Sequence, residues 1–286
     1  MAQICVRITE FTDPACPWAY SAEPFRQRIS WLYDGRIEWE PRMVVLASSR
    51  EEQVEKGMTP EKLAHNMKRI AGEHLMPIDT REKPYVPPSR DACRLVVAAR
   101  VHSDKLTVRR LLRNLRIRNF KGELLDDPDV LRGAAEIAGI EGDYEEWMAD
   151  PEVERELEAD AALARRPMPA AAVLDHKLAN WSGGRRYTCP SYEMTRLSDG
   201  VTISIPGFQP FAVYDTILAN LVPGMDRREP AESAEQVLAW RGFPLSTQEV
   251  ATVRDIPFEA AREELGRVAD QEYVGADGFW HLRESR

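Results

Sequence analysis

A cysteine followed by a proline stands where the first predicted strand of this chain gives way to a helix. Residues 3–11 alternate β-branched or apolar side chains with polar ones, which predicts a strand. Residues 12–15 are rich in turn formers, and a helix with apolar residues at helical spacing follows them. A second strand is expected over residues 36–46. The chain therefore begins as a strand–helix–strand unit with Cys16 at its first junction.

The middle of the chain is predicted to be helical, and strands return after it. The apolar spacing and the Asp and Pro residues at helix starts predict helices at 60–74, 89–103, 108–116, from 128 onward, and at 151–165. A hairpin over 186–205 and a helix over 208–221 then close the unit. This order is that of an α/β thioredoxin-like fold with a helical insertion domain.

The last part of the chain differs in character. Three short helices followed by a β-hairpin are expected, an order that resembles a winged helix. Such folds often bind DNA, but residues 231–286 carry eleven acidic and six basic side chains, and a groove-reading module is normally basic. We therefore expect a winged-helix-like C-terminal extension that packs or binds a partner. The predicted division is 1–46 and 181–224 for the thioredoxin-like core, 47–180 for the insertion and 225–286 for the extension.

Composition excludes several classes of protein. The net charge of −9 over 286 residues argues against nucleic acid as a partner. No apolar stretch approaches the roughly 18–20 residues of a membrane span, and the first residues lack a secretory pattern, so we expect a cytoplasmic protein without a membrane partner. The four cysteines form no Cys-x-x-Cys pair, and the histidines show no metal-ligand spacing, so no metal site and no histidine role are predicted. The histidines are residues 65, 74, 102, 176 and 281.

Charge is distributed unevenly along the helical middle. Residues 94–121 hold nine basic side chains and one acidic, whereas residues 122–166 hold fifteen acidic and four basic. We expect the two segments to pack against each other or to face different surroundings, as solvated helix faces.

Cys16 is the residue best placed for chemistry. A cysteine in the first turn of a helix lies among free backbone N–H groups at the positive end of the helix dipole, and both stabilise a thiolate. A proline next to it costs no hydrogen bond at that position and presets the helical backbone. The arrangement predicts a nucleophile at neutral pH.

The sequence resembles a known family at this point. Phe-x-Asp-Pro before Cys-Pro-Trp at residues 11–18, the Asp-Asp-Pro helix start at 126–128 and Ile-Pro-Gly-Phe-Gln-Pro at 205–210 are similar to motifs of the DsbA-like thioredoxin-fold oxidoreductases. The sequence resembles in particular the cytoplasmic FrnE-like branch, which is related to 2-hydroxychromene-2-carboxylate isomerase and kappa-class glutathione transferase. The resemblance covers residues 3–221. It implies a thioredoxin fold with thiol–disulfide chemistry.

The resemblance also implies a substrate-facing wall. It places the family's cis-proline at Pro190 rather than Pro210, because a hairpin and a helix must still follow it. A cis-proline presents the backbone of the preceding segment to an extended substrate. We therefore expect Pro17, Trp18, Thr188 and Pro190 to contact substrate. An ordinary trans-proline at Pro190 and a purely structural Trp18 are the alternatives.

Ala19 departs from the family pattern. Dithiol members have Cys-Pro-Trp-Cys, and without the second cysteine a mixed disulfide cannot be resolved within the motif. A small thiol could resolve it, or Cys189 could be a displaced partner for Cys16; both are therefore candidate catalytic residues. The alternatives are a glutathione-type-thiol-dependent isomerase or transferase and a non-catalytic binding module.

The remaining candidates are weaker. We expect Cys5 and Cys93 to be buried small hydrophobes, and Cys189 to be either packed or redox-active. The arginines of the basic segment could hold the carboxylates of a tripeptide thiol, although a solvated face is the simpler expectation; they are residues 109, 110, 113, 116 and 118. No tightly bound cofactor is expected, beyond a low-molecular-weight thiol as co-substrate. The expected partners are protein or small-molecule thiols and disulfides, and a homodimer is compatible with the sequence.

Overall fold

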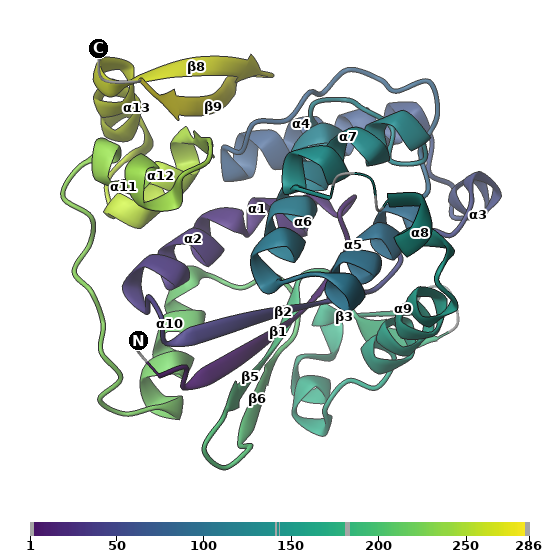
Figure 1. The fold of residues 1–286 in the computed structure, drawn as a ribbon, viewed down its shortest axis with the longest axis horizontal. Helices are drawn as coiled ribbons and strands as arrows, with labels where there is room; N and C mark the ends of the chain where they lie inside the picture. The colour runs from purple at the N-terminus through teal and green to yellow at the C-terminus, as the bar shows by residue number, and fades with distance from the viewer. Residues whose placement is uncertain (1–2, 141, 143, 181–183, 284–286) are drawn as a thin grey trace.

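A mixed four-stranded sheet lies at the centre of the protein (Figure 1). The computed structural model describes residues 3–140, 142, 144–180 and 184–283. The strand order is β2-β1-β5-β6, in which β1 and β2 are parallel and the other neighbours are antiparallel. The strands are β1 (Val6–Thr12), β2 (Ile37–Met43), β5 (Ser191–Arg196) and β6 (Thr202–Ile205).

Three helices belong to the same unit as this sheet: α1 (Pro17–Ser21), α2 (Glu23–Leu32) and α10 (Phe211–Leu221). Ile8 of β1, Ile29 of α2 and Leu218 of α10 are almost fully buried in one hydrophobic cluster. The strand–helix–strand start, the later hairpin and the closing helix confirm the thioredoxin-like arrangement predicted from the sequence.

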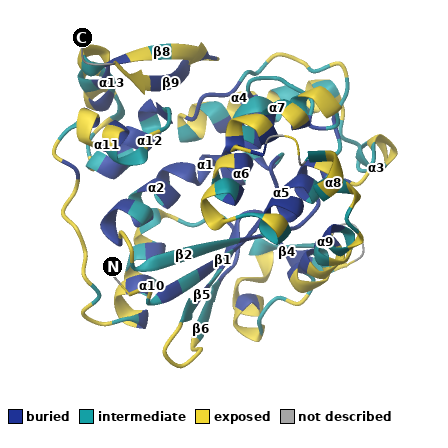
Figure 2. Cartoon of the chain, viewed as in Figure 1, coloured by how far each residue is buried: buried dark blue, intermediate teal, exposed yellow. Residues whose placement is uncertain are grey.

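The segment between β2 and β5 is mostly helical. Thr or Asp side chains accept hydrogen bonds from first-turn N–H groups of α4, α6, α7 and α9, which explains where these helices begin. Helix α5 is buried along most of its length, as Figure 2 shows, and contacts α6, α8, α9 and β2. The elements are α3 (Arg50–Glu55), α4 (Pro60–His74), α5 (Arg90–His102), α6 (Lys105–Phe120), α7 (Pro128–Ala138), α8 (Tyr144–Ala149), α9 (Pro151–Ala164), a 3₁₀ segment η1 (Pro169–Lys177), β3 (Leu178–Asn180) and β4 (Arg185–Tyr187).

The basic and acidic segments of this region lie against each other. Arg100 of α5 binds the fully buried Asp160 of α9 at 2.5 Å, and Arg90 pairs with Glu154. His102 lies 2.9 Å from Asp150. The opposite charges therefore contribute to helix contacts. The end of this region, predicted between residues 180 and 181, falls on residues 181–183, outside the described residues.

The C-terminal extension has the element order expected of a winged helix. It contains α11 (Ala234–Arg241), β7 (Leu245–Ser246), α12 (Thr247–Arg254), α13 (Phe258–Val268), β8 (Ala269–Val274) and β9 (Asp277–Leu282). The strands form a small sheet in the order β7-β9-β8. The two-residue strand β7 is additional to the predicted elements, because two residues are too few to produce an alternating pattern.

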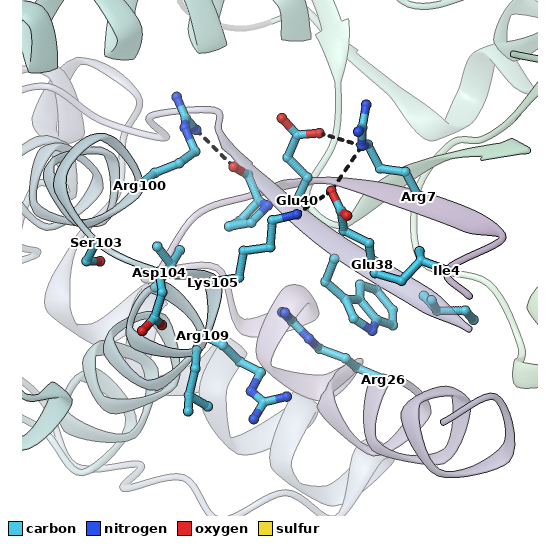
Figure 3. Close-up of a pocket in the computed structure, with 15 residues that line it drawn as sticks. Ile4, Arg7, Arg26, Glu38, Glu40, Arg100, Ser103, Asp104, Lys105 and Arg109 are labelled. Carbon is cyan, nitrogen blue, oxygen red and sulfur yellow. Dashed lines mark hydrogen bonds and ion pairs between the residues drawn. The ribbon is translucent and has the colours of Figure 1, made fainter. Parts of the chain in front are cut away.

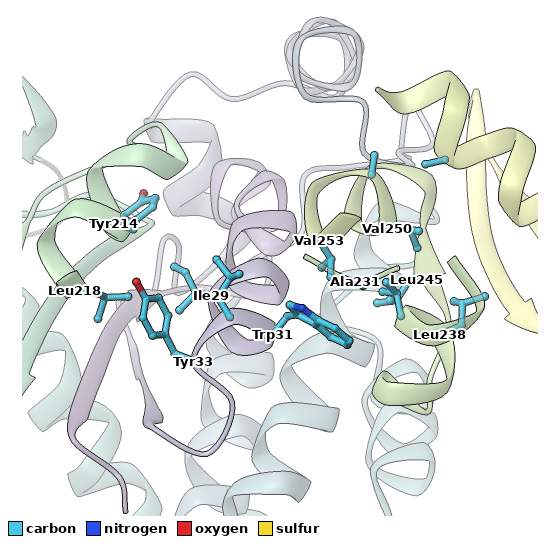
Figure 4. Close-up of a cluster of buried hydrophobic side chains, with 14 of the residues drawn as sticks. Ile29, Trp31, Tyr33, Tyr214, Leu218, Ala231, Leu238, Leu245, Val250 and Val253 are labelled. Atoms are coloured by element: carbon cyan, nitrogen blue, oxygen red, sulfur yellow. The ribbon is translucent and has the colours of Figure 1, made fainter. Parts of the chain in front are cut away.

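The extension shares its core with the thioredoxin-like unit. Trp31 of α2 packs against Trp240, with ring centroids 5.1 Å apart, and its indole N–H donates to the carbonyl of Glu229 at 2.7 Å. Figure 4 shows Trp31 between the Ile29–Tyr214 side and the Leu238–Val250 side of one hydrophobic cluster. Among the described residues, no helix is both long and apolar enough to cross a membrane.

Candidate active site at the start of helix α1

Cys16 occupies the N-terminal cap position of α1. Its backbone N–H donates to the carbonyl of Asp13 at 3.1 Å, its carbonyl accepts from the N–H of Tyr20 at 3.0 Å, and Pro17 begins the helix. The side chain is 5% exposed. The predicted junction of strand and helix thus places one thiol at the positive end of α1.

Cys189 lies directly against Cys16. The Sγ atom of Cys16 is 3.3 Å from the carbonyl oxygen of Cys189, so the expected proximity of the two residues is confirmed. The Cys189–Pro190 peptide bond is cis. Ser191 fixes this loop, because its hydroxyl donates to the carbonyl of Thr188 at 2.7 Å and accepts from the N–H of Gly207 at 2.9 Å. Both cysteines are free thiols in the structure.

The pair is electrostatically asymmetric. Burial raises the pKa of Cys16, but hydrogen bonds from the Cys189 side chain and from the N–H groups of Ala19 and Trp18 outweigh it and leave the pKa below the usual cysteine value. Burial, the bond to Cys16 and the charge of Cys16 raise the pKa of Cys189 far above that value. Cys16 is therefore the more acidic thiol of the pair.

Asp13 is a functional residue that the sequence reasoning quoted without giving it a role. It is fully buried, and it accepts hydrogen bonds from the N–H groups of Ala15 and Leu46 at 2.7 and 2.8 Å and from the hydroxyl of Ser89 at 2.6 Å. Asp13 therefore connects the turn before Cys16 to Leu46 and to Ser89 of the insertion, and so fixes that turn in place. An aspartate directly after a predicted strand and before Pro was the available signal.

The other two cysteines lie in different surroundings. Cys93 is fully buried in α5, as predicted, and its thiol donates to Asp13 at 3.3 Å. Burial and the charge of Asp13 raise the pKa of Cys93 well above its usual value. Cys5 is only partly buried, which corrects the prediction: it precedes β1, packs at the edge of the main hydrophobic cluster, and its thiol donates to the carbonyl of Gln3.

Trp18 forms one side of the site. It packs at the edge of the cluster that contains both Cys16 and Cys189, and its ring lies 5.2 Å from that of His74 and 5.6 Å from that of Phe208. Together with Pro17 it borders a cavity of about 260 Å³. The polar part of that cavity includes Gln53, Asn66, Arg69, Lys83 and Asn119.

The predicted arginine face is wrong for its two central members. Arg113 and Arg116 are buried, not solvated, because they pair with carboxylates from other parts of the chain. Arg116 binds Glu10 at 2.8 Å and also Glu23, and Arg113 binds Glu249 at 2.6 Å. These two guanidinium groups are therefore occupied by protein carboxylates. Among the described histidines, cysteines and acids, no group of three or more could hold a metal ion.

Comparison with known proteins agrees with this fold. The model of the DSBA-like thioredoxin domain matches residues 7–169. Cytosolic disulfide reductase DsbM of Pseudomonas aeruginosa superposes with a TM-score of 0.52 at 17% identity, over 75% of this chain and 99% of that chain. No curated protein matches the sequence.

Two further solved structures have the same fold. A protein assigned as a disulfide isomerase from Nitrosomonas europaea has a TM-score of 0.56 at 14% identity, over 76% of this chain and 98% of that chain. A protein assigned as a DsbA oxidoreductase from Streptomyces coelicolor has a TM-score of 0.53 at 20% identity, over 79% and 93%. With more than half of its residues matched by the family model, and with a cysteine at the expected helix start, the chain belongs to the DSBA-like thioredoxin family, whose members are generally thiol–disulfide oxidoreductases.

Proposed function

We propose that the protein is a thiol–disulfide oxidoreductase of the FrnE-like type that acts through the single motif cysteine, Cys16. The observation that carries the proposal is the asymmetric pair of thiols: the pKa of Cys16 is lowered at the helix start, and Cys189 lies against it with a raised pKa. A thiolate is the attacking species in disulfide exchange.

The first step joins Cys16 to the substrate. Its thiolate attacks one sulfur of a substrate disulfide, the substrate S–S bond breaks, and the other substrate sulfur leaves as a thiolate that takes a proton from solvent. A mixed disulfide between Cys16 and the substrate remains. Pro17, Trp18, Thr188 and the backbone before Pro190 form the wall that we propose to hold the substrate.

The second step has two routes. When Cys16 is capped, it no longer carries the charge that raises the pKa of Cys189, so Cys189 becomes easier to ionise. Its thiolate can then attack Cys16 and release the substrate as a thiol, leaving a Cys16–Cys189 disulfide. Alternatively a small thiol attacks the substrate sulfur, and Cys16 leaves as a thiolate.

The proposal includes a site for a small-thiol co-substrate beside the motif. DsbM, to which this fold is similar, has been solved with GSH. The 260 Å³ cavity bordered by Pro17 and Trp18 offers Asn66 and Arg69 as polar groups next to an apolar wall. We propose that a low-molecular-weight thiol enters there without being tightly bound.

The test is mass spectrometry of protein treated with oxidised glutathione and quenched under non-reducing conditions. C16S should form no adduct, and C189S should accumulate the adduct on Cys16 if Cys189 resolves it. Equal adduct levels in C189S and the unmodified protein assign resolution to the small thiol. Adducts on Cys5 or Cys93 alone, or GSH binding without any disulfide, contradict the proposal; the latter favours an isomerase or transferase.

A further inference from the structure

A second cavity lies at the opposite end of β1 from Cys16. It encloses about 910 Å³ between the outer face of β2 and the start of α6. Its walls include Arg7 near the start of β1, Trp39 of β2, Arg26 of α2 and Arg109 of α6. Figure 3 shows Arg26 and Arg109 extending toward one another from their two helices. Nothing in the proposed disulfide chemistry uses this cavity.

Two of the three acidic residues of the wall, Glu38 and Glu40, are already ion-paired, and the third, Asp104, caps α6 by accepting from the N–H of Thr107 at 2.8 Å. Glu38 accepts from Arg7 at 3.2 Å and from Lys105 at 2.7 Å, as the dashed lines in Figure 3 show. Glu40 pairs with Arg42 and lies 3.4 Å from Arg7. Glu38 and Glu40 are therefore engaged by other cations and not by Arg109.

An ion cluster behind the cavity, buried except at Arg109 and Arg241, has more cations than anions. Glu10 binds Arg26 at 2.6 Å and Arg116 at 2.8 Å. Glu23 and Glu249 are likewise engaged by Arg116 and Arg113. The cluster includes three carboxylates and five guanidinium groups, which are Glu10, Glu23 and Glu249 and Arg26, Arg109, Arg113, Arg116 and Arg241.

Arg109 and Arg241 are the two unpaired members. Neither has a carboxylate within ion-pair distance among the residues that the structure describes, and the Nε atom of each is buried without an acceptor. The guanidinium of Arg241 lies 4.8 Å from the ring of Phe243, which also contacts Arg113 at 4.7 Å. An aromatic ring rather than an anion therefore separates two of the positive charges.

The excess charge carries an energetic penalty. Burial and the repulsion of Arg109, Arg113 and Arg26 lower the pKa of Arg241 well below its usual value, and burial and neighbouring arginines also lower the pKa of Arg109. A guanidinium keeps its proton in proteins, so it cannot escape the penalty by becoming neutral. An exchangeable anion would remove it.

We propose that this cavity binds a small molecule bearing a phosphate dianion, with Arg109 as the direct ligand and Arg241 as a second cation that strengthens the positive field. Two unpaired cations match the charge of a phosphate dianion, and the planar guanidinium fork matches its oxygens. The volume exceeds what phosphate alone needs, and Trp39 provides an apolar wall for an organic body.

The first test is calorimetric titration of the full chain in phosphate-free, low-salt buffer, with inorganic phosphate and with phenyl phosphate. R109Q should weaken binding about tenfold or more, as expected when a charge-assisted hydrogen bond is lost. R110Q is the matched control, because Arg110 is exposed and lies outside the cavity wall, and it should change binding less than about twofold. Tighter binding of phenyl phosphate identifies an organic ester as the ligand class, and equal binding identifies free phosphate.

The second test measures thermal stability with and without phosphate. Without anion, R241Q should raise the midpoint of thermal unfolding, because it removes an unpaired and partly buried charge, and phosphate should reduce the difference from the unmodified protein. Absence of binding of both probes, equal loss in R109Q and R110Q, or a lower midpoint for R241Q without phosphate would overturn the proposal. R109K keeps the positive charge but lacks the planar pair of guanidinium N–H donors, so it should bind phosphate with an affinity between those of R109Q and the unmodified protein.

Discussion

At the scale of single residues, the chemistry depends on what surrounds two sulfur atoms. Cys16 and Cys189 are both almost fully buried, so burial alone would raise both pKa values. The difference comes from donors: Cys16 receives backbone N–H groups of α1 and the Cys189 thiol, whereas Cys189 faces the charge of Cys16. A helix start therefore selects which cysteine reacts.

Alkylation should reveal this selection. As the pH is raised from 5, iodoacetamide should label Cys16 before Cys93 and Cys189, because the pKa of Cys16 is lowered and the other two are raised. Peptide mapping by mass spectrometry identifies the labelled site, and C16A should lose the fast phase. Labelling of Cys93 first would show that the site is assigned wrongly.

Ala19→Cys should restore a resolving thiol within the motif. Ala19 is buried in the same cluster as Cys16, three residues along α1. The mixed disulfide on Cys16 should then be shorter-lived, and insulin reduction should be faster, because an intramolecular thiol attacks at high effective concentration. Mass spectrometry of reaction samples quenched over time, under non-reducing conditions, measures the lifetime of the mixed disulfide. Equal lifetimes in the two proteins would mean that resolution already occurs at Cys189.

The sequence could predict Cys16 but not the arginines. Cys16 is identified by local neighbours, namely the strand before it and Pro17 after it. Arg113 and Arg116 look solvated in a helix pattern, because their counterions are distant along the chain: Glu23 is 93 residues from Arg116 and Glu249 is 136 residues from Arg113. Local periodicity contains no information on pairs at that separation.

At the scale of elements, the hairpin β8–β9 is fixed to the rest of the protein at its turn. Gly275 has φ of +61°, and a Cβ atom there would collide with the backbone carbonyl of Ile78, in the segment between α4 and α5. Gly200, in the β5–β6 turn, has a similar φ of +74° with open space around it. Both glycines therefore have a left-handed backbone, but only Gly275 lies against another part of the chain.

Gly275→Ala should therefore destabilise far more than Gly200→Ala. The left-handed backbone costs an alanine roughly 1 kcal/mol at either position, and the collision adds roughly 1–3 kcal/mol at Gly275. Urea unfolding followed by tryptophan fluorescence gives both free energies. Equal losses would show that the turn moves freely away from Ile78.

The whole molecule is held together by charges as well as by its core. Glu23 of α2 lies among guanidinium groups from two helices, and Glu249 of the extension binds Arg113 of the insertion. The three parts of the predicted division therefore meet in one ion cluster. Their order was predictable from strand and helix patterns, whereas their mutual contacts were not.

Acid should weaken this junction. Burial alone would raise the pKa of Glu23. The positive charges of Arg116, Arg26 and Arg113 outweigh burial and lower the pKa from the usual 4.5 to about 2. Stability from a lowered carboxyl pKa is present above pH 4.5 and is lost as the pH falls toward 2, by about 3 kcal/mol for this difference. In urea unfolding, E23Q should be less stable than the unmodified protein at pH 6, and the gap should narrow toward pH 2.

A matched control separates this effect from general acid sensitivity. E158Q, at an exposed position in the middle of α9 and away from the helix ends, should follow the unmodified protein at every pH. A constant gap between E23Q and the unmodified protein would contradict the assigned pKa.

The contact between Arg113 and Glu249 also sets an order of events during synthesis. At roughly 5–20 residues per second, the 136 residues between them take roughly 7–27 s to emerge from a ribosome. Throughout that interval the guanidinium of Arg113 lacks Glu249, and for most of it the indole of Trp31 lacks Trp240 of α11, which later packs against it. Until α11 and α12 have been synthesised, the nascent chain thus exposes the aromatic face at Trp31, the kind of apolar surface that chaperones bind.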